Sequence, residues 1–179
     1  MKKIISLFTL LATVQCAQAH AQVPFQASLT PEVAIYNKDA TIGGLALNVW
    51  GENEVRGLDL GFVNVQKGDS AGLTWSLLGG TVENYKGVIL GGFYTRSTGE
   101  VLGWQSALVN FSDGELKGLQ SGLVNFAQDV TGVQFGLFNC SQRLNGVQVG
   151  LVNVVAQNSW FRHLPGELAT GFPFINWSF

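Results

Sequence analysis

The sequence predicts an all-β protein made from one repeated strand, and three observations support this fold class. First, an eight-residue phrase recurs seven times across residues 57–153: glycine, apolar, variable, apolar, small, apolar, apolar and usually asparagine. Second, the phrases are rich in Val, Leu, Phe and Trp, while turn residues fill the connectors. Third, Asp59 is the only charged residue within the phrases and an earlier, degraded copy at 44–51. A repeat this dense predicts that each unit buries its apolar face on its neighbours.

Residues 1–19 are predicted to form a secretory signal peptide, with cleavage after residue 19 or residue 21. Lys2 and Lys3 precede an apolar stretch, and small residues flank both cleavage points. Residues 22–179 are then expected to form a single repeat-built β domain. Cys140 is the one cysteine after this cleavage, so we expect no intramolecular disulfide.

The phrase has two different faces when it is placed on a strand. Side chains alternate across a strand, so phrase positions 2, 4 and 6 share one face, and these positions are apolar. The opposite face carries the glycine, the variable residue and the small residue, as in Gly118, Gln120 and Gly122. One face is therefore strongly apolar and the other is narrow and mildly polar.

Two all-β architectures satisfy this pattern. The first is an up-and-down antiparallel β-barrel of about ten short-looped strands, with the apolar face toward lipid and the Gly/Gln face lining a tight lumen. The phrases start 14 to 16 residues apart, which leaves about nine to eleven residues per strand, enough to cross a bilayer. The second is a β-solenoid of 14–16-residue coils, with the apolar face inward and the recurring asparagines stacked as a ladder.

The C-terminus favours the barrel. It places Ile175, Trp177 and the terminal Phe179 on one strand face, and so resembles the closing strand and assembly signal of bacterial outer-membrane β-barrels. Strands at 25–36 and 170–179, added to the eight phrases, give ten, and single-chain bacterial barrels have an even number. We therefore expect an exported protein in the outer membrane or at the cell surface of a Gram-negative-type bacterium, with the lipid bilayer and the barrel assembly machinery as partners.

The phrases also resemble those of a family of uncharacterised exported bacterial proteins with surface repeats of the Gly-apolar-Gln-apolar-Gly-apolar-apolar-Asn type. The resemblance covers residues 44–153 and extends through 160–169 into 176–179. It implies export and a repeat architecture, but the family has no established activity to transfer. The chain departs from the pattern at 72–79 and 87–94, where both Gln and Asn are lost, so an asparagine ladder would be interrupted there.

Two groups of residues are candidate functional positions. The longest connector, 156–169, could recognise a partner, because barrel proteins usually keep function on long loops. Its candidate residues are Trp160, Phe161, His163 and Glu167. The variable position of the phrase would line a barrel lumen. Its candidate polar residues are Asp59, Gln105, Gln120, Gln134 and Gln148.

The sequence does not predict an enzyme. Residues 68–72 match the G-x-S-x-G nucleophile elbow, but no helical pattern follows them, so we interpret them as a polar hairpin turn. A lipid hydrolase would need His163 as a base near Ser70, Ser159 or Ser178, and nothing in the spacing promotes that arrangement. No His/Cys/carboxylate cluster has metal-ligand spacing, and the chain has no basic patch for nucleic acid. We expect no metal and no cofactor.

These observations predict an exported outer-membrane or cell-surface β-repeat protein with a structural or narrow-channel role and no catalysis. The alternative is a soluble periplasmic or surface-displayed β-solenoid that binds a partner along one face. An outer-membrane lipid hydrolase is a more distant alternative.

Overall fold

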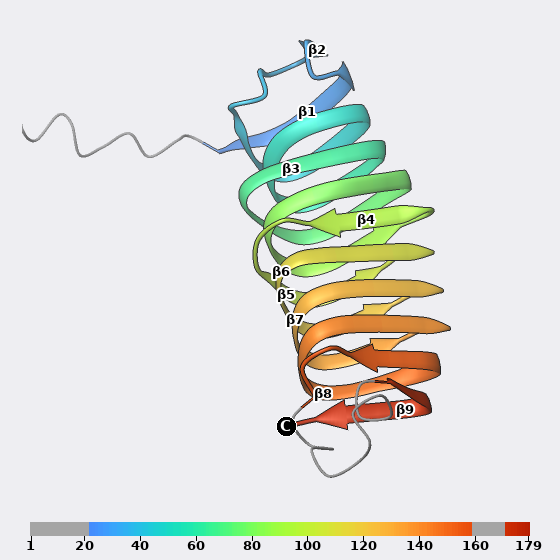
Figure 1. The fold of residues 1–179 in the computed structure, drawn as a ribbon. Helices are drawn as coiled ribbons and strands as arrows, with labels where there is room; N and C mark the ends of the chain where they lie inside the picture. Colours follow the sequence, from blue (N-terminus) through green and yellow to red (C-terminus); the bar gives the residue numbers. More distant parts are fainter. Residues whose placement is uncertain (1–21, 159–170) are drawn as a thin grey trace, which may run out of the picture.

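The chain forms a β-solenoid whose coils stack in sequence order along one axis (Figure 1). This computed structural model describes residues 22–158 and 171–179. The described part is all-β and contains about eight turns of solenoid. The general all-β prediction is therefore confirmed, and the solenoid matches the second of the two expected architectures.

The strand assignments follow the chain around successive coils. Strand β3 is long because three consecutive coils continue through their corners without a break in the ladder. The strands are β1 (Val23–Thr30), β2 (Val33–Ala34), β3 (Thr41–Gly91), β4 (Tyr94–Ser97), β5 (Val101–Ser106), β6 (Val109–Ser121), β7 (Val124–Phe135), β8 (Phe138–Val155) and β9 (Gly171–Ser178).

The prediction of an antiparallel barrel is wrong, because neighbouring phrases pair in parallel. Gly118 lies opposite Gly132, Gln120 opposite Gln134, and the equivalent positions of the next coil continue the same register. A barrel of hairpins would reverse direction at every connector and set unlike positions side by side. The connectors instead carry the chain onward in the same rotational sense, so each residue type stacks on its own copy.

The two ends of the solenoid depart from parallel stacking. At the first end, β1 pairs in parallel with β3 and in antiparallel with the short β2. At the last end, β9 lies antiparallel to β8, with Trp177 opposite Val147 (Figure 1). The segment expected to close a barrel against the first strand thus pairs with its sequence neighbour and forms the final layer of the stack.

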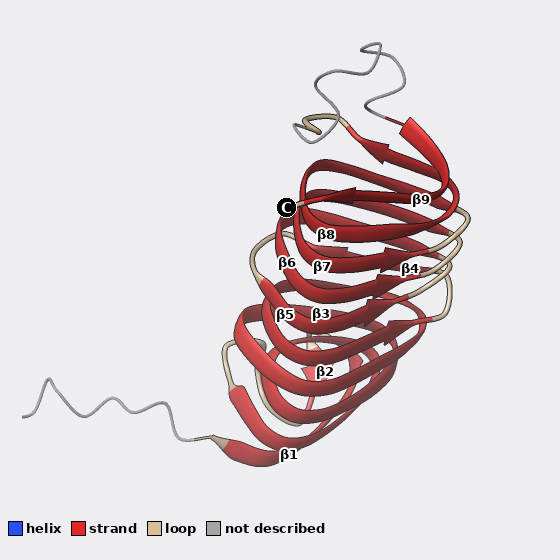
Figure 2. Cartoon of the chain, turned by 90° about the horizontal axis from the view of Figure 1, so that it is seen from below, coloured by secondary structure: helices blue, strands red, loops and turns tan. Residues whose placement is uncertain are grey.

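Each coil is flattened, with two strands joined by a tight turn at one edge and a connector at the other. In one coil, residues 116–121 form the first strand, Gly122 and Leu123 the turn, and residues 124–127 the second strand. Figure 2 shows that strand covers most of each coil and that loops lie at its edges. Stacking the coils produces two parallel sheets that face each other across a thin interior.

The interior is largely polar and the exterior is largely apolar. Among the described residues, a row of large apolar side chains runs through the interior of successive coils: Tyr85, Val101, Leu116, Val130 and Leu144. Val82, Ile89 and Val155 belong to the same buried cluster. The remaining interior rows consist mainly of Gln, Asn, Ser and Thr. Phrase positions 2, 4 and 6 point outward, so the expectation that a solenoid would turn them inward is wrong.

The recurrence of glycine at the start of every phrase has a steric cause at the corner of each coil. Gly132 has φ 139°, which side-chain-bearing residues rarely adopt. A Cβ placed there would lie 2.0 Å from the carbonyl oxygen of Gly118 in the preceding coil. Glycine is therefore required wherever one coil passes over the next at this corner.

Candidate functional site

The glutamines expected to line a lumen form a continuous ladder inside the solenoid. The side-chain amide of Gln120 donates to Gln105 Oε1 at 3.2 Å, Gln134 donates to Gln120 at 2.7 Å, and Gln148 donates to Gln134 at 2.7 Å. The same amide nitrogens reach backbone carbonyls of the opposite sheet, as from Gln148 to Val154 at 3.1 Å. These side chains are fully buried and fill the space between the sheets.

A second ladder is made by the asparagine that ends each phrase. Asn110 Nδ2 donates to Asn125 Oδ1 at 2.8 Å, Asn125 to Asn139 at 2.7 Å, and Asn139 to Asn153 at 2.8 Å. Each amide also donates to backbone carbonyls beside the tight turn. Asparagine donates toward later coils and glutamine toward earlier ones, so the amide dipoles of the two ladders oppose each other along the axis.

Asp59 takes the glutamine position in an early coil and is 1 % exposed. Its carboxylate accepts from Asn48 Nδ2 at 2.8 Å and from Gln66 Nε2 at 2.5 Å. Gln66 Nε2 also donates to Thr74 Oγ1, which contacts the hydroxyl of Tyr85. Burial raises the pKa of Asp59 to about 6, and the two amide donors oppose that rise. Asp59 is therefore part of a buried hydrogen-bond network with Asn48 and Gln66, and it faces no lumen.

The exterior carries an apolar sheath, which we define by three sets of outward side chains that wrap three sides of the solenoid. Face A, on the first strand of each coil, consists of Leu58, Leu60, Leu73, Trp75, Val88, Leu90, Trp104, Leu119, Val133, Phe135, Val147 and Val149. The turn row consists of Leu78, Phe93, Leu108, Leu123, Leu137 and Leu151. Face B, on the second strand, consists of Val63, Val65, Tyr94, Val109, Phe111, Val124, Phe126, Phe138, Val152 and Val154.

The sheath runs along the stack, interrupted by Ser106 and Ser121 on face A and by Thr81 and Arg96 on face B. Turn-row residues are roughly half exposed, as in Leu123 at 49 %. On face B the rings of Phe111 and Phe126 stack with centroids 5.5 Å apart. A monomeric soluble protein rarely exposes a contiguous apolar patch of more than a few hundred Å². A sheath over two faces and the edge between them therefore indicates a surface that is covered in the working protein.

The fourth side is a charged edge formed by the connectors. It carries Glu52, Glu54, Arg56, Lys67, Asp69, Glu83, Lys86, Glu100, Asp113, Glu115, Lys117, Asp129 and Arg143. Arg96 borders this edge from face B, where it lies in register with Phe111. Several ion pairs there join adjacent coils: Lys117 with Glu100 at 2.9 Å, Arg96 with Asp113 at 2.7 Å, and Arg143 with Asp129. The hydrogen bonds to Arg143 hold the pKa of Asp129 below its usual range.

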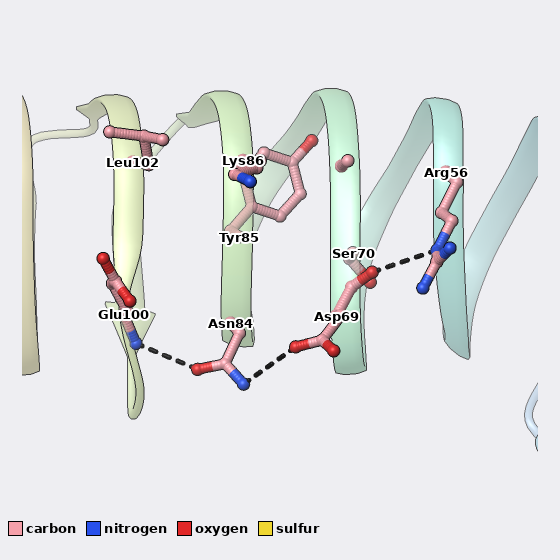
Figure 3. A pocket seen from close by; sticks show the side chains of 9 residues that line it. Arg56, Asp69, Ser70, Asn84, Tyr85, Lys86, Glu100 and Leu102 are labelled. Carbon is pink, nitrogen blue, oxygen red and sulfur yellow. Dashed lines mark hydrogen bonds between the residues drawn. The ribbon is translucent and has the colours of Figure 1, made fainter.

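A groove of about 630 Å³ lies along this edge. Figure 3 shows the side chains that line it. Asn84 Nδ2 donates to Asp69 Oδ1 at 3.1 Å, and the backbone N–H of Glu100 donates to Asn84 Oδ1 at 3.0 Å (Figure 3). Arg56 Nε donates to the backbone carbonyl of Asp69. The groove lining is mixed in charge, and its polar groups are largely bonded to one another from coil to coil.

Ser70, from the G-x-S-x-G match, lies in the interior of β3 and is 3 % exposed. Its hydroxyl accepts from the backbone N–H of Val55 at 3.1 Å and contacts the carbonyl oxygen of Lys67 at 3.2 Å. This hydroxyl thus satisfies backbone groups of two coils. No histidine falls within 22–158 or 171–179, and those residues contain no group of three or more His, Cys, Asp or Glu side chains that could hold a metal ion.

The candidate partner residues Trp160, Phe161, His163 and Glu167 lie outside the described residues, as does Ser159. Ser178, the last serine considered as a nucleophile, is a buried residue of β9. Within the part of the chain that the structure describes, no helix is long and apolar enough to cross a membrane.

No protein family matches the chain, and comparison with curated proteins and with solved structures finds no similar protein. The resemblance to surface-repeat proteins therefore stays a prediction. The sheath and the charged edge are the surfaces from which function can be argued.

The barrel interpretation of the sequence already turned phrase positions 2, 4 and 6 toward lipid. It did not predict that a turn at Leu123 and Leu137, followed by a second strand with Phe126, would carry this apolar surface around three sides of each coil. Part of the signal was present, because Gln recurs on the face opposite the large apolar residues. Asn, at phrase position 8, would share the apolar face of an unbroken strand, and it reaches the interior because a turn at Gly122 and Leu123 intervenes. Amides repeated at one period form ladders in a polar interior, which leaves the apolar face outside.

Proposed function

We propose that the protein is an exported, non-catalytic envelope protein that attaches to a lipid bilayer through its apolar sheath. The observation that carries the proposal is the distribution of polarity, which is the reverse of that in a soluble globular protein. The amide ladders are buried, and large apolar side chains are exposed on the surface. Burying this much apolar surface is favourable by about 25 cal/mol for each Å² removed from water. The bilayer provides such an environment, and the charged edge can remain in water.

Lipid fits the shape of the sheath better than a single protein partner does. Face A and face B lie on opposite sides of the flattened coils, and the turn row joins them. A partner docked on one face, including a second copy of this chain, would leave the other face in water. A fluid hydrocarbon phase can cover both faces and the turn row at once.

Polar groups within the sheath are already satisfied, as lipid contact requires. Trp104 Nε1 donates to Ser121 Oγ at 2.7 Å, and Ser121 Oγ contacts Ser106 Oγ at 3.0 Å. The backbone of each coil pairs with the coils above and below it. Such pairing leaves only the two ends of the stack as sheet edges.

A structural role is more consistent with this architecture than a channel. The channel interpretation required an open lumen, and the interior between the sheets is filled by Gln105, Gln120, Gln134, Gln148 and their asparagine counterparts, all fully buried. Catalysis has no support from Ser70, whose hydroxyl is bonded to backbone groups. We therefore propose a scaffold or anchor at the membrane surface.

Co-flotation with liposomes tests the proposal. Purified full-length protein, with detergent removed in the presence of phosphatidylcholine vesicles, is expected to float with the lipid in a density gradient. The double variant Leu123→Glu/Leu137→Glu is expected to lose most of this binding, because it places carboxylates in the turn row. Both side chains point outward, so the fold should survive and show an unchanged far-UV circular dichroism spectrum.

The matched control is Gln128→Glu/Asn145→Glu, which adds the same charge to exposed residues beside the charged edge, in the coil of Leu123 and in the coil that follows Leu137. This control should float like the wild type. Wild-type protein that stays at the bottom of the gradient as a folded monomer would refute the proposal. A folded wild-type dimer that ignores vesicles would show instead that a second copy covers the sheath.

A further inference from the structure

Resting on the proposed attachment to lipid, we infer that the solenoid lies flat in a single leaflet, with its axis parallel to the membrane plane. In this orientation the turn row points toward the bilayer midplane. The charged edge lies along the headgroups, and faces A and B contact acyl chains on either side. The inference names the lipid region that each side of the molecule contacts.

The depth of one coil matches one leaflet. Leu123 in the turn row lies six residue steps after Lys117 at the charged edge. At roughly 3.3 Å per residue this strand extends about 20 Å. The hydrocarbon core of a bilayer is about 30 Å thick, so one leaflet provides about 15 Å. The apolar part of the strand, from Leu119 to Leu123, covers about 13 Å at the same rise.

The phrase cannot cross the whole bilayer in this fold because it doubles back. The second strand returns from Leu123 through Phe126 to Gln128, which is exposed at the connector. The eight-residue phrase therefore enters and leaves the same leaflet. This path explains the absence of charge within the phrase just as well as a strand that crosses the whole bilayer would.

The charged edge excludes the perpendicular orientation. Its charges recur along the whole stack, from Glu54 in an early coil to Arg143 in a late one. An axis along the membrane normal would place the charges of the middle coils, such as Glu100 and Lys117, in hydrocarbon, where ionised groups are strongly disfavoured. An axis in the plane keeps all of them at one depth, among headgroups and water.

The residues between the apolar sheath and the charged edge are of types that favour the boundary between hydrocarbon and headgroups. Trp104 lies on face A, two residues after Leu102. The register partners of Leu102 are Lys86 and Lys117, which occupy the outward row next to the charged edge. Lysine stems can cover apolar surface while the ammonium reaches water, and tryptophan is enriched at the headgroup level. On face B, Arg96 occupies the corresponding border and pairs with Asp113.

Depth-dependent fluorescence quenching tests the orientation. In a Cys16→Ser/Cys140→Ser background, a single cysteine carrying a polarity-sensitive dye is placed at Leu108, Leu123 or Leu137 in the turn row. Two further variants place it at Gln128 or Thr131, near the charged edge. Each full-length protein is bound to vesicles whose lipids carry a nitroxide either at the headgroup or near the end of the acyl chain.

We expect the three turn-row labels to show equal depth and at least twofold stronger quenching by the chain-end nitroxide than by the headgroup nitroxide. The labels at Gln128 and Thr131 should show the reverse order. Depth that changes steadily from Leu108 through Leu123 to Leu137 would overturn the flat orientation. Strong quenching of the Gln128 label by chain-end nitroxide would overturn it as well.

The failure of the inference can be told apart from the failure of the proposed function. If the labelled proteins float with vesicles but the turn-row labels remain quenched by aqueous iodide, lipid binding stands and the orientation is wrong. If no label responds to any lipid nitroxide and the proteins do not float, both are wrong.

Discussion

The early coils, residues 41–97, and the late coils, residues 101–155, share one backbone geometry but differ in how their interiors are bonded. In the late coils, the ladder glutamines (105, 120, 134 and 148) and asparagines (110, 125, 139 and 153) stack on one another, and every ladder step is present. In the early coils, the positions equivalent to the ladder glutamines are occupied by Asp59, Thr74 and Ile89. The asparagine row reads Asn48, Asn64, Gly80 and Thr95.

Breaking the ladders leaves unpartnered polar atoms in the early coils. Four buried side-chain atoms have no hydrogen-bond partner among the described residues, and three of them are Asn64 Oδ1, Gln66 Oε1 and Ser76 Oγ. The fourth, Gln148 Oε1, belongs to the last glutamine of its ladder. Buried polar groups without partners cost stability. The corner glycines are common to both regions, and we infer that the complete ladders make the late coils the more stable of the two.

Replacing a corner glycine should have the largest effect and should be equally severe in both regions. Gly132→Ala and Gly72→Ala each place a Cβ 2.0 Å from a carbonyl oxygen of the preceding coil, at positive φ. We expect a loss of about 4 kcal/mol or more in the free energy of unfolding, measured by urea denaturation in mild detergent. Gly171→Ala is the control, because its Cβ would meet nothing closer than 3.8 Å. A marked difference between Gly72 and Gly132 would contradict a shared corner geometry.

Removing one asparagine amide should reduce the free energy of unfolding more in the late coils than in the early coils. Asn125→Ala removes two ladder bonds and a bond to the carbonyl of Phe135, so it should cost about 3 kcal/mol. Asn64→Ala loses only a 3.4 Å contact with the carbonyl of Trp75 and also removes an unpartnered oxygen. It should cost about 1 kcal/mol or less. Equal losses in the same denaturation experiment would show that the ladders do not distinguish the regions.

The early coils should also respond to pH through Asp59. Its pKa of about 6 in the folded state lies above the ordinary value of 3.8. Folding therefore favours the protonated form, and this contribution is complete below pH 4 and is lost as pH rises through 6. The loss is on the order of 3 kcal/mol at pH 7.

Asp59→Asn should remove this dependence, so the variant should match the wild type near pH 4 and exceed it at pH 7. The Asn amide can donate to Gln66 Oε1, which has no partner in the wild type. Taking the difference between variant and wild type at each pH cancels the titration of the surface carboxylates. A constant difference across pH 4 to 7 would mean that Asp59 keeps its ordinary pKa.

The smallest effect is expected at the charged edge. Arg96→Met removes an ion pair with Asp113 whose side chains are 54 % and 43 % exposed. Screening by water and salt limits such pairs to less than about 1 kcal/mol. Thermal unfolding of the variant should therefore lie close to that of the wild type, and the gap should shrink further in high salt. A large loss would mean that inter-coil ion pairs, and not the ladders, hold the stack together.

Much of the local structure could be predicted from the sequence, but its assembly could not. The strands, the turn chemistry and the location of the charges at connectors, with Asp59 as the exception, follow from the phrase itself. The two expected architectures each contained part of the answer: the barrel had Gln120 inside and Leu119 outside, and the solenoid had the stacking of Asn125 on Asn139. The structure combines the orientation of the first with the parallel stacking of the second.

The reason for the error is physical. A strand with one apolar and one polar face is equally consistent with hairpins in lipid and with coils in lipid, because alternation along a single strand does not reveal the direction of its neighbour. Parallel stacking was indicated by the identity of Gln120 and Gln134, since like amides bond to each other in register. The aromatic end, with Trp177 and Phe179, was assigned to barrel closure because the local pattern of an antiparallel cap is the same.

Hydrophobic photolabelling tests the central claim, that the apolar sheath faces lipid, most directly. A photoactivated carbene probe dissolved in the hydrocarbon of isolated membranes should label peptides through the turn row and faces A and B, including Leu123, Phe126 and Leu137. It should leave Asp113, Lys117 and Arg143 unlabelled. Labelling restricted to the connectors, or absent from folded protein that remains with the membranes, would contradict the claim.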